Sequence, residues 1–593
     1  MQQLDEDVEK YRNNESLLHM ICAFGAKFLA LNYTSQLSSE AILTAGNQWA
    51  KIAKARIFVD LDDLSMEKLM AAILLYDHDL RIGSYASAFM LSGITARMSQ
   101  ALQLNLENSA DVLCAKSESS PVDNEARRRS MWSCYVMDSW VGSGVNQLTL
   151  LEDRDLKIQL PCHSHNFSLG VPCITETLEE GKVLGFISRD DVPSFPAQNM
   201  GIEAYFIRLV SSRKKVLRYV KQLDTSKPPW QSDSEFIQLT MEFDHWRHNL
   251  PQSLMWSPSA IYARKESSQL GALTLLWCTY HQTLVDLYRI GMPILFRIQK
   301  DITFPPDQQE FLENCRRACF ENAREVSSII CEALRHGIKN LADTWLCIIA
   351  HDSTKVMLHF LKLNRQSSHR MSQNEVDATV TLVQKNLEAL LQMRAIVATA
   401  EHCYLSVIKM MAAAGIQPQM PYGTAMNARP SHESEESPSA PESPVQESPE
   451  NMLNPLAIYR MARTALHEKD QSSTSTSPST NTSISAAVAR ARARAVERPP
   501  RRVQQHQQHP NTSFQGLNGL PGMDQIYFAP NSATESTPMS MNDMVPLAAS
   551  GLGGPWDPAN LAVMDILDGG IAPWTEEYLT DGQSGVDPFL FPF

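Results

Sequence analysis

The chain has 593 residues, 43% of them hydrophobic, and a formal net charge of −14. This acidic balance argues against a nucleic-acid-binding surface spread over the whole chain, although a local basic element is still compatible with it. Eleven cysteines stand at irregular spacings, and no apolar run approaches the roughly 18 to 20 residues that span a bilayer. We therefore expect a soluble nuclear or cytosolic protein with reduced thiols.

Residues 1–14 are charged and predict a frayed start, whereas residues 15–414 show apolar side chains at helical spacing. Strand-like alternation is nearly absent, so this part is predicted to be one all-α domain. Short turns such as 81–83 predict antiparallel helix neighbours, and residues 162–198 predict a long irregular connection. The predicted helices cover 15–31, 41–59, 65–79, 84–104, 125–138, 202–223, 235–249, 270–290, 306–334, 342–363 and 374–414.

Residues 415–540 are rich in Ser, Thr and Pro and predict a disordered linker, because such segments bury too little apolar surface to offset the entropy of ordering. Within it, residues 490–502 form a basic run with six arginines in an alanine-rich frame. Two interpretations stay open for this run. It is either a nuclear-import or nucleic-acid-contacting segment, or a solvated stretch without a receptor.

Residues 541–593 contain no Lys or Arg and interleave acids with bulky apolar groups. Mutual repulsion of the acids keeps such a tail solvated, which leaves its large side chains available to a partner's groove. This composition favours an acidic-hydrophobic activation tail over a featureless one. The candidate contact residues are Trp556, Leu561, Ile566, Leu567, Trp574, Tyr578, Leu579, Phe589 and Phe591.

The motifs of the common catalytic and metal sites are missing from the sequence. It has no Cys-x2-Cys pair, no His-Glu-x-x-His, no Gly-x-Ser-x-Gly and no phosphate-binding or dinucleotide fingerprint. Cys162, His163, His165 and Cys173 lie near one another in the irregular connection, and we interpret them as loop residues rather than metal ligands. The sequence thus predicts no enzyme activity, no cofactor and no metal bound by this chain.

The segment from Glu125 to Pro161 carries the most distinctive pattern. Three consecutive arginines, Arg127 to Arg129, run into an apolar helix with Trp132 and Asp138, and an extended exit segment follows. We expect one or two of these arginines to reach carboxylates while the others stay in water. Buried arginines paired with acids can fix helix packing, so a structural role is favoured over ligand binding.

Together with three earlier motifs, this pattern resembles the regulatory domain of fungal binuclear zinc-cluster transcription factors, the middle homology region of the xylanolytic-activator type. The resemblance is close over residues 15–165, and the helices that follow to about residue 414 resemble the family only in their general pattern. Its motif residues are Trp49, Gly83, Gly93, Arg97, Arg127, Arg128, Arg129, Trp132, Asp138 and Pro161.

The resemblance implies an all-α domain and a nuclear regulator of RNA polymerase II transcription. Its expected partners are the transcription machinery, contacted through the acidic tail, and DNA, contacted through a six-cysteine zinc cluster upstream of Met1 or through another protein. Zinc is expected only with that upstream cluster, and a homodimer and a small-molecule effector are further candidate partners. The alternative is a helical interaction or sensor protein without DNA contact that modulates a related transcription factor.

Overall fold

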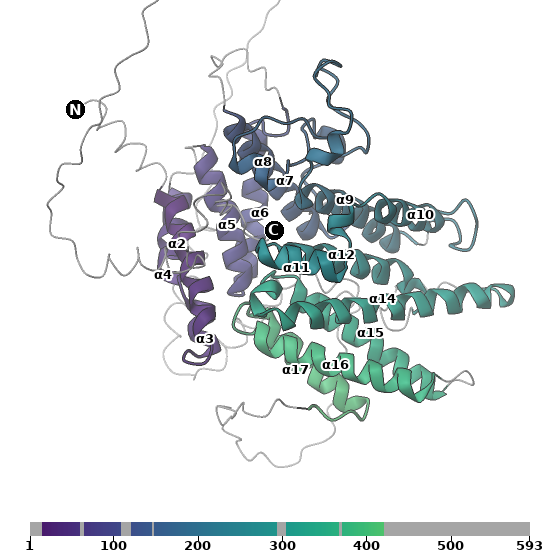
Figure 1. The fold of residues 1–593 in the computed structure, drawn as a ribbon. Helices are drawn as coiled ribbons and strands as arrows, with labels where there is room; N and C mark the ends of the chain where they lie inside the picture. Colours follow the sequence, from purple (N-terminus) through teal and green to yellow (C-terminus); the bar gives the residue numbers. More distant parts are fainter. Residues whose placement is uncertain are drawn as a thin grey trace, which may run out of the picture. The chain divides into compact units, whose positions relative to one another are not determined.

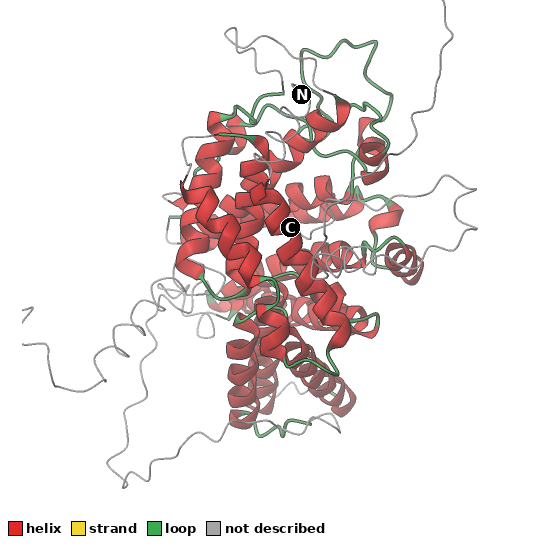
Figure 2. Ribbon diagram, turned by 90° about the vertical axis from the view of Figure 1, so that its left-hand side faces the viewer, coloured by secondary structure: helices red, strands yellow, loops and turns green. Residues whose placement is uncertain are grey.

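A computed structural model describes residues 15–59, 64–107, 120–144, 148–223, 225–292, 304–366 and 371–419. This part of the chain contains no β-strand, only two isolated bridges, so the all-α prediction is confirmed (Figure 2). Its α-helices are α2 (Glu15–Ala30), α3 (Ser39–Thr44), α4 (Asn47–Val59), α5 (Met66–Arg81), α6 (Tyr85–Ala101), α7 (Pro121–Gly142), α8 (Ser164–Ser168), α9 (Ile202–Lys221), α10 (Glu235–His248), α11 (Pro258–Glu266), α12 (Leu270–Tyr288), α14 (Gln309–Arg335), α15 (Leu346–Gln366), α16 (Gln373–Met393) and α17 (Thr399–Ala413).

The first helices pack in sequence order, as the short turns predict. Helix α2 packs against α4 and α5, α5 against α6, and α6 against α7 (Figure 1). The tight turn between α5 and α6 depends on Gly83, whose φ of +80° suits a residue without a side chain. In this turn the Ser84 N–H donates to the Asp79 carbonyl at 2.7 Å.

The prediction of one helix over 41–59 is wrong, because the chain breaks into α3 and α4 at Gly46. This residue has a φ of +82°, and a Cβ built on it would lie 2.2 Å from the carbonyl oxygen of Ala23 in α2. The glycine therefore serves a close backbone approach between two helices and a turn at the same time.

The second half is built around α12 and α14, which pack against each other, while α14 also contacts α15 and α16 (Figure 1). The predicted apolar stripe of α12 is buried, with Leu273, Leu276 and Tyr280 each at most 2% exposed. Helix α11 was not predicted. The long helix expected over 374–414 is wrong, since α16 ends at Met393 and α17 begins at Thr399.

That break has a tertiary cause. The Ala398 N–H donates to the carbonyl of Arg81 at the end of α5 at 2.7 Å. The Arg81 side chain is 1% exposed and donates to the Ala342 carbonyl at 2.6 Å. Trp140 of α7 stacks on Trp345 just before α15, with ring centroids 4.8 Å apart. The early and late helices are thus joined in one compact unit.

The connection between α7 and α9 is irregular, as predicted, with only short helical turns such as α8. Thr175 anchors it: its N–H donates to the side-chain oxygen of Gln159 at 2.7 Å, and its hydroxyl donates to the Leu160 carbonyl at 2.5 Å. Arg208 of α9 pairs with Glu176 at 2.7 Å. Polar contacts therefore hold this connection against its neighbours.

One described helical segment, Glu15–Tyr33, is long and apolar enough to cross a membrane by length and composition alone. The prediction that no run approaches that length is therefore wrong. The segment is 39% buried in the structure, and its inner face, with Met20, Ala23 and Phe24, belongs to the core. A core helix meets the same criterion, so the segment carries no further conclusion.

The predicted frayed start at 1–14 lies outside the described residues. So do the linker from residue 420 on, with its basic run, and the whole predicted activation tail.

Candidate functional site

Helix α7 carries the arginine motif and begins earlier than the sequence pattern predicts, at Pro121 rather than near Glu125. Ser120 and Asp123 form a capping box: the Ser120 hydroxyl accepts from the Asp123 N–H at 3.1 Å, and the Asp123 carboxylate accepts from the Ser120 N–H at 3.3 Å. Pro121 suits the first helical position because its missing N–H has no partner there. This start places the three arginines beyond the first turn.

The buried carboxylate of Glu125 lies at the centre of the arginine cluster. It is 2% exposed and accepts from Arg128 at 3.1 Å, from Arg129 at 3.0 Å and from the backbone N–H of Cys162 at 2.9 Å. Arg129 also donates to the Cys162 carbonyl at 2.9 Å and pairs with Glu203 of α9 at 3.4 Å. One carboxylate thus ties together α7, the exit segment and, through Arg129, α9.

Arg128 makes a second ion pair that extends this arrangement. Its Nε donates to Glu107 at 2.6 Å, and the other oxygen of Glu107 accepts from the backbone N–H of Gln159 at 3.1 Å. Arg127 is half-buried and donates to the carbonyl of Leu102 at 3.2 Å. Two arginines reach carboxylates, as predicted, but Arg127 binds a carbonyl instead of remaining only in water.

The next residues of α7 hold the exit segment by its backbone and acids. Trp132 is fully buried and its indole N–H donates to the Gln159 carbonyl at 2.8 Å. The Tyr135 hydroxyl donates to Asp153 at 2.9 Å, and Asp153 also pairs with Lys214 of α9. These contacts fix the exit segment along α7.

Asp138 completes this arrangement. Its carboxylate is 2% exposed and accepts from the backbone N–H groups of Leu150 and Leu151, each at 2.9 Å. Burial raises the pKa of Asp138 to about 6, while the two N–H groups and Lys214 oppose that rise. The contacts of α7 favour the structural interpretation of its motif residues, because each polar group is used to hold a neighbouring segment.

The other motif residues do not gather at this place. Trp49 is partly buried against the core, and Gly83 lies beside the Cβ of Ala398, in the turn between α5 and α6. The carbonyl of Pro161 accepts from the N–H of Gly201 at 3.2 Å, just before α9. The motif is therefore distributed over several packing contacts.

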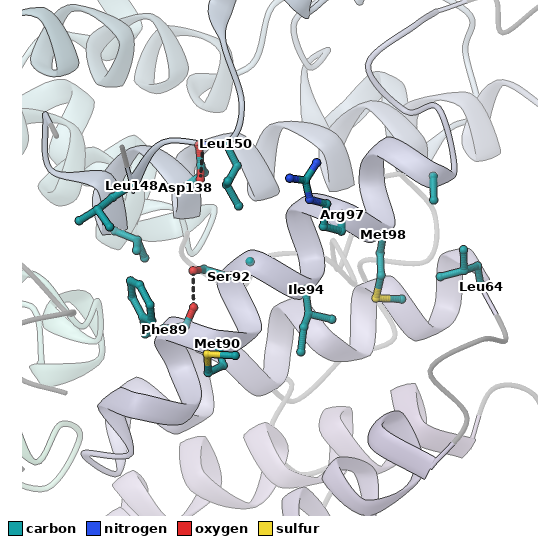
Figure 3. A pocket seen from close by; sticks show the side chains of 13 residues that line it. Leu64, Phe89, Met90, Ser92, Ile94, Arg97, Met98, Asp138, Leu148 and Leu150 are labelled. Carbon is teal, nitrogen blue, oxygen red and sulfur yellow. Dashed lines mark hydrogen bonds between the residues drawn. The ribbon is translucent and has the colours of Figure 1, made fainter. Parts of the chain in front are cut away.

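Gly93 and Arg97 line a groove of about 560 Å³ on one side of α6 (Figure 3). Its wall is apolar apart from Ser92, Arg97 and the edge of Asp138. Arg97 is exposed and donates to the side chain of Gln100 at 2.9 Å. Met90 is 60% exposed and, like Leu64, Phe89, Ile94, Met98, Leu148 and Leu150, lines the groove. Such a surface suits apolar groups rather than catalysis. The groove was not predicted from the sequence, although the apolar residues of 88–104 on more than one helix face were a usable signal.

The cysteine and histidine residues of the connection form a small polar cluster. The Cys162 thiol donates to the His163 carbonyl at 3.6 Å, and the neighbouring Cys162 lowers the pKa of the Cys173 thiol. The ring of His163 accepts from the N–H of His165 at 3.2 Å, as a local cap. Among the described residues, no group of three or more His, Cys, Asp or Glu side chains is placed to hold a metal ion.

Part of the chain is similar in sequence to known fungal proteins. Residues 3–248 match the family model of the fungal specific transcription factor domain. An uncharacterized transcriptional regulatory protein of Schizosaccharomyces pombe is 28% identical over 281 residues, which are 46% of this chain and 28% of that protein. A Zn(2)-C6 fungal-type transcription factor of Fusarium oxysporum f. sp. lycopersici is 26% identical over 330 residues, which are 54% of this chain and 34% of that protein. The matches thus cover about a third or less of these relatives, and no solved structure shows a significant match.

Proposed function

Because the chain carries a fungal specific transcription factor domain, we propose that it is a nuclear regulator of RNA polymerase II transcription in a fungus. The observation that carries this proposal is the match over residues 3–248, which includes the buried contacts of α7. The relatives are named as transcriptional regulators and transcription factors. We accordingly propose a regulatory protein rather than an enzyme.

In this proposal the helical domain over 15–414 has the regulatory role and residues 541–593 contact the transcription machinery. The linker over 415–540 separates the two. Support for the tail's role is compositional: acids are interleaved with tryptophan, leucine and phenylalanine, and no basic residue is present to neutralise them.

DNA contact is proposed to come from a zinc cluster upstream of Met1 or from a partner protein. The Fusarium relative is named as a Zn(2)-C6 fungal-type transcription factor, which supports the first route. This chain itself is proposed to hold no zinc or other cofactor. A homodimer and a small-molecule effector belong to the proposal as further partners.

The tail's role is tested by fusing residues 541–593 to an unrelated DNA-binding domain and measuring transcription of a reporter gene in a fungal host. We expect transcription well above that of the DNA-binding domain alone. A variant with Trp556→Ala, Trp574→Ala and Phe589→Ala should lose most of this increase, because these side chains would fill the partner's groove. The matched control, with Thr575→Ala, Thr580→Ala and Ser584→Ala, should keep it. A fusion no more active than the DNA-binding domain alone would remove activation from the proposal.

The second candidate function is a helical interaction protein that modulates a related transcription factor. The polar contacts from α7 to the exit segment and α9 support it, since they hold these segments in one fixed arrangement that a partner protein could contact. Transcripts that depend on this chain are measured with and without the related factor. If this chain changes those transcripts only when the related factor is present, the modulator is supported. If it still changes them when the factor is absent, a regulator with its own route to DNA is supported.

Nuclear localisation is tested separately with a fluorescent fusion of the full chain. If the basic run at 490–502 directs import, replacing its six arginines with glutamine should shift the protein to the cytoplasm. Replacing the same number of surface lysines and arginines in the helical domain is the control. An unchanged nuclear signal would favour the solvated interpretation of the run.

A further inference from the structure

Two cysteines of the irregular connection, Cys162 and Cys173, are brought together by the backbone segments that carry them. The Leu160 N–H donates to the Glu176 carbonyl at 2.8 Å, and the Leu160 carbonyl accepts from the Thr175 hydroxyl at 2.5 Å. Cys162 follows Leu160 by two residues, and Cys173 precedes Thr175 by two. Both cysteines have free thiols and line the same small pocket at the end of these segments.

The two thiols differ in exposure and in pKa. Cys162 is 2% exposed, and the neighbouring Cys173 together with burial raises its pKa. Cys173 is partly exposed, and the neighbouring Cys162 lowers its pKa, while burial and Glu125 oppose that change. The side chain of Asn166 and the charge of Arg128 add to the lowering. A larger share of Cys173 is therefore in the reactive thiolate form at neutral pH.

The pocket beside the two thiols admits only a small reactant. Its volume is about 110 Å³, which corresponds to about four waters at their liquid volume. Its wall includes Arg128 and Asn166, which are polar and partly exposed. Hydrogen peroxide is polar and little larger than water, so it suits this pocket, whereas a bulky oxidant such as oxidised glutathione does not fit.

A second pair of neighbouring thiols shows what proximity alone provides. Cys347 of α15 and Cys403 of α17 are 0% and 8% exposed. The neighbouring Cys347 and burial raise the pKa of Cys403 well above its usual value. This pair therefore lacks both access for an oxidant and a thiolate that could attack it. Exposure and a lowered pKa distinguish Cys173 from these two residues.

We propose that Cys162 and Cys173 are an oxidation site, at which hydrogen peroxide converts the two thiols into a disulfide. The Cys173 thiolate attacks one peroxide oxygen: an S–O bond forms, the O–O bond breaks, and the released hydroxide takes a proton to become water. Cys173 is then a sulfenic acid, and the peroxide has been reduced. The Cys162 sulfur next attacks the Cys173 sulfur, the S–O bond breaks, and the hydroxide leaves with the Cys162 proton as a second water.

The disulfide would act directly on the arginine cluster of α7. The Cys162 N–H donates to Glu125 at 2.9 Å, and the Cys162 carbonyl accepts from Arg129 at 2.9 Å. A bond from Cys173 to this residue joins the later part of the connection covalently to that cluster. The oxidation site stands independently of a role in transcription, and only its use as a transcriptional signal rests on the proposed function.

The test treats the purified, fully reduced full chain with hydrogen peroxide and then blocks the remaining thiols with iodoacetamide. The tryptic peptide 158–182 contains Cys162 and Cys173 and no other cysteine. We expect mass spectrometry to find this peptide unblocked and lighter by two hydrogen atoms, and a thiol reductant to reverse the change. Cys347 and Cys403 are the internal control and should be oxidised at least about tenfold more slowly. Absence of the linked peptide in the folded wild type, or equal oxidation of the two pairs, would overturn the proposal.

Two variants separate the roles of the thiols. In Cys162→Ser the sulfenic acid at Cys173 has no thiol to attack it, so dimedone, which reacts with sulfenic acids, should label Cys173. In Cys173→Ser the buried Cys162 should stay unlabelled. Label on Cys162 in the second variant, with none on Cys173 in the first, would overturn the assignment of Cys173 as the attacking thiol. Far-UV circular dichroism checks that each variant folds, and the wild-type peptide remains the test of the pair if one does not.

Discussion

Replacing Glu125 with glutamine tests whether one buried carboxylate holds the arginine cluster of α7. The wild-type carboxylate accepts three hydrogen bonds, from Arg128, Arg129 and the Cys162 N–H, at 2.9 to 3.1 Å. A glutamine of the same shape can keep two of them at its oxygen. Its amide nitrogen, however, then faces Arg128, so a donor meets a donor and the negative charge is gone.

The magnitude follows from these contacts. Removing one partner of a buried ion pair costs about 3 to 5 kcal/mol, and a hydrogen bond to a charged group contributes about 1.5 to 3 kcal/mol. Glu107 still pairs with Arg128, and Glu203 with Arg129, so part of the charge is compensated. We therefore expect Glu125→Gln to lower the free energy of unfolding by about 2 to 4 kcal/mol.

The assay is urea unfolding of the full chain followed by far-UV circular dichroism, compared through the midpoint at unchanged slope. The matched control is Glu179→Gln, which breaks an exposed pair with Lys182 and should cost less than about 1 kcal/mol. A Glu125→Gln variant as stable as the Glu179→Gln control would refute the reasoning. It would mean that α7 is held by apolar packing and that the carboxylate is replaceable.

Three further changes test other parts of the fold. Gly46→Ala should lower the free energy of unfolding by more than about 2 kcal/mol in urea, because it combines a φ of +82° with a Cβ 2.2 Å from a carbonyl oxygen. The control Gly181→Ala has a φ of +71° but open space around its Cβ, so it should lower the free energy of unfolding less. Equal losses in the two variants would contradict the close approach at Gly46. Burial raises the pKa of Asp343 to about 7, so its folded pKa lies above the unfolded one and its contribution to stability falls as pH rises from about 4 to 7. Asp343→Asn should therefore gain up to about 3 kcal/mol relative to wild type between pH 4.5 and pH 8, and a constant difference across that range would contradict this assignment. Trp132→Phe removes the N–H that donates to the buried Gln159 carbonyl and should lower the free energy of unfolding by about 2 to 4 kcal/mol. Calorimetry can measure this loss, and a loss below about 1 kcal/mol would mean that the hydrogen bond is dispensable.

Much of the helical architecture could be predicted from local pattern. The stripe of α12 was identified by its 3.6-residue spacing and is buried, because a helix of that pattern has one face to place in a core. The start of α7 was missed although Ser120, Pro121 and Asp123 carry a capping signal. The arginines that follow dominate the local pattern, and they lie beyond the first turn that the cap begins.

The arginine motif shows where prediction from sequence stops. Its residues indicate that acids must be near, but not which ones. Glu125 is local, three or four residues away on the same helix, whereas Glu107 and Glu203 come from distant segments. The groove beside α6 was not predicted either, since it is a space between separate segments.

The amino-acid sequence by itself determined the all-α class, most helix positions and the segment on which the domain is organised, because helical spacing and the arginine motif are local properties. Only the tertiary structure decided where the chain breaks at Gly46 and between Met393 and Thr399, since those breaks serve a carbonyl of α2 and the end of α5. Within the described residues, it also left the buried Tyr76 hydroxyl without a hydrogen-bond partner. The physical reason is that a hydrogen bond or a void between distant helices depends on how they pack, and no single window of sequence contains both sides of it.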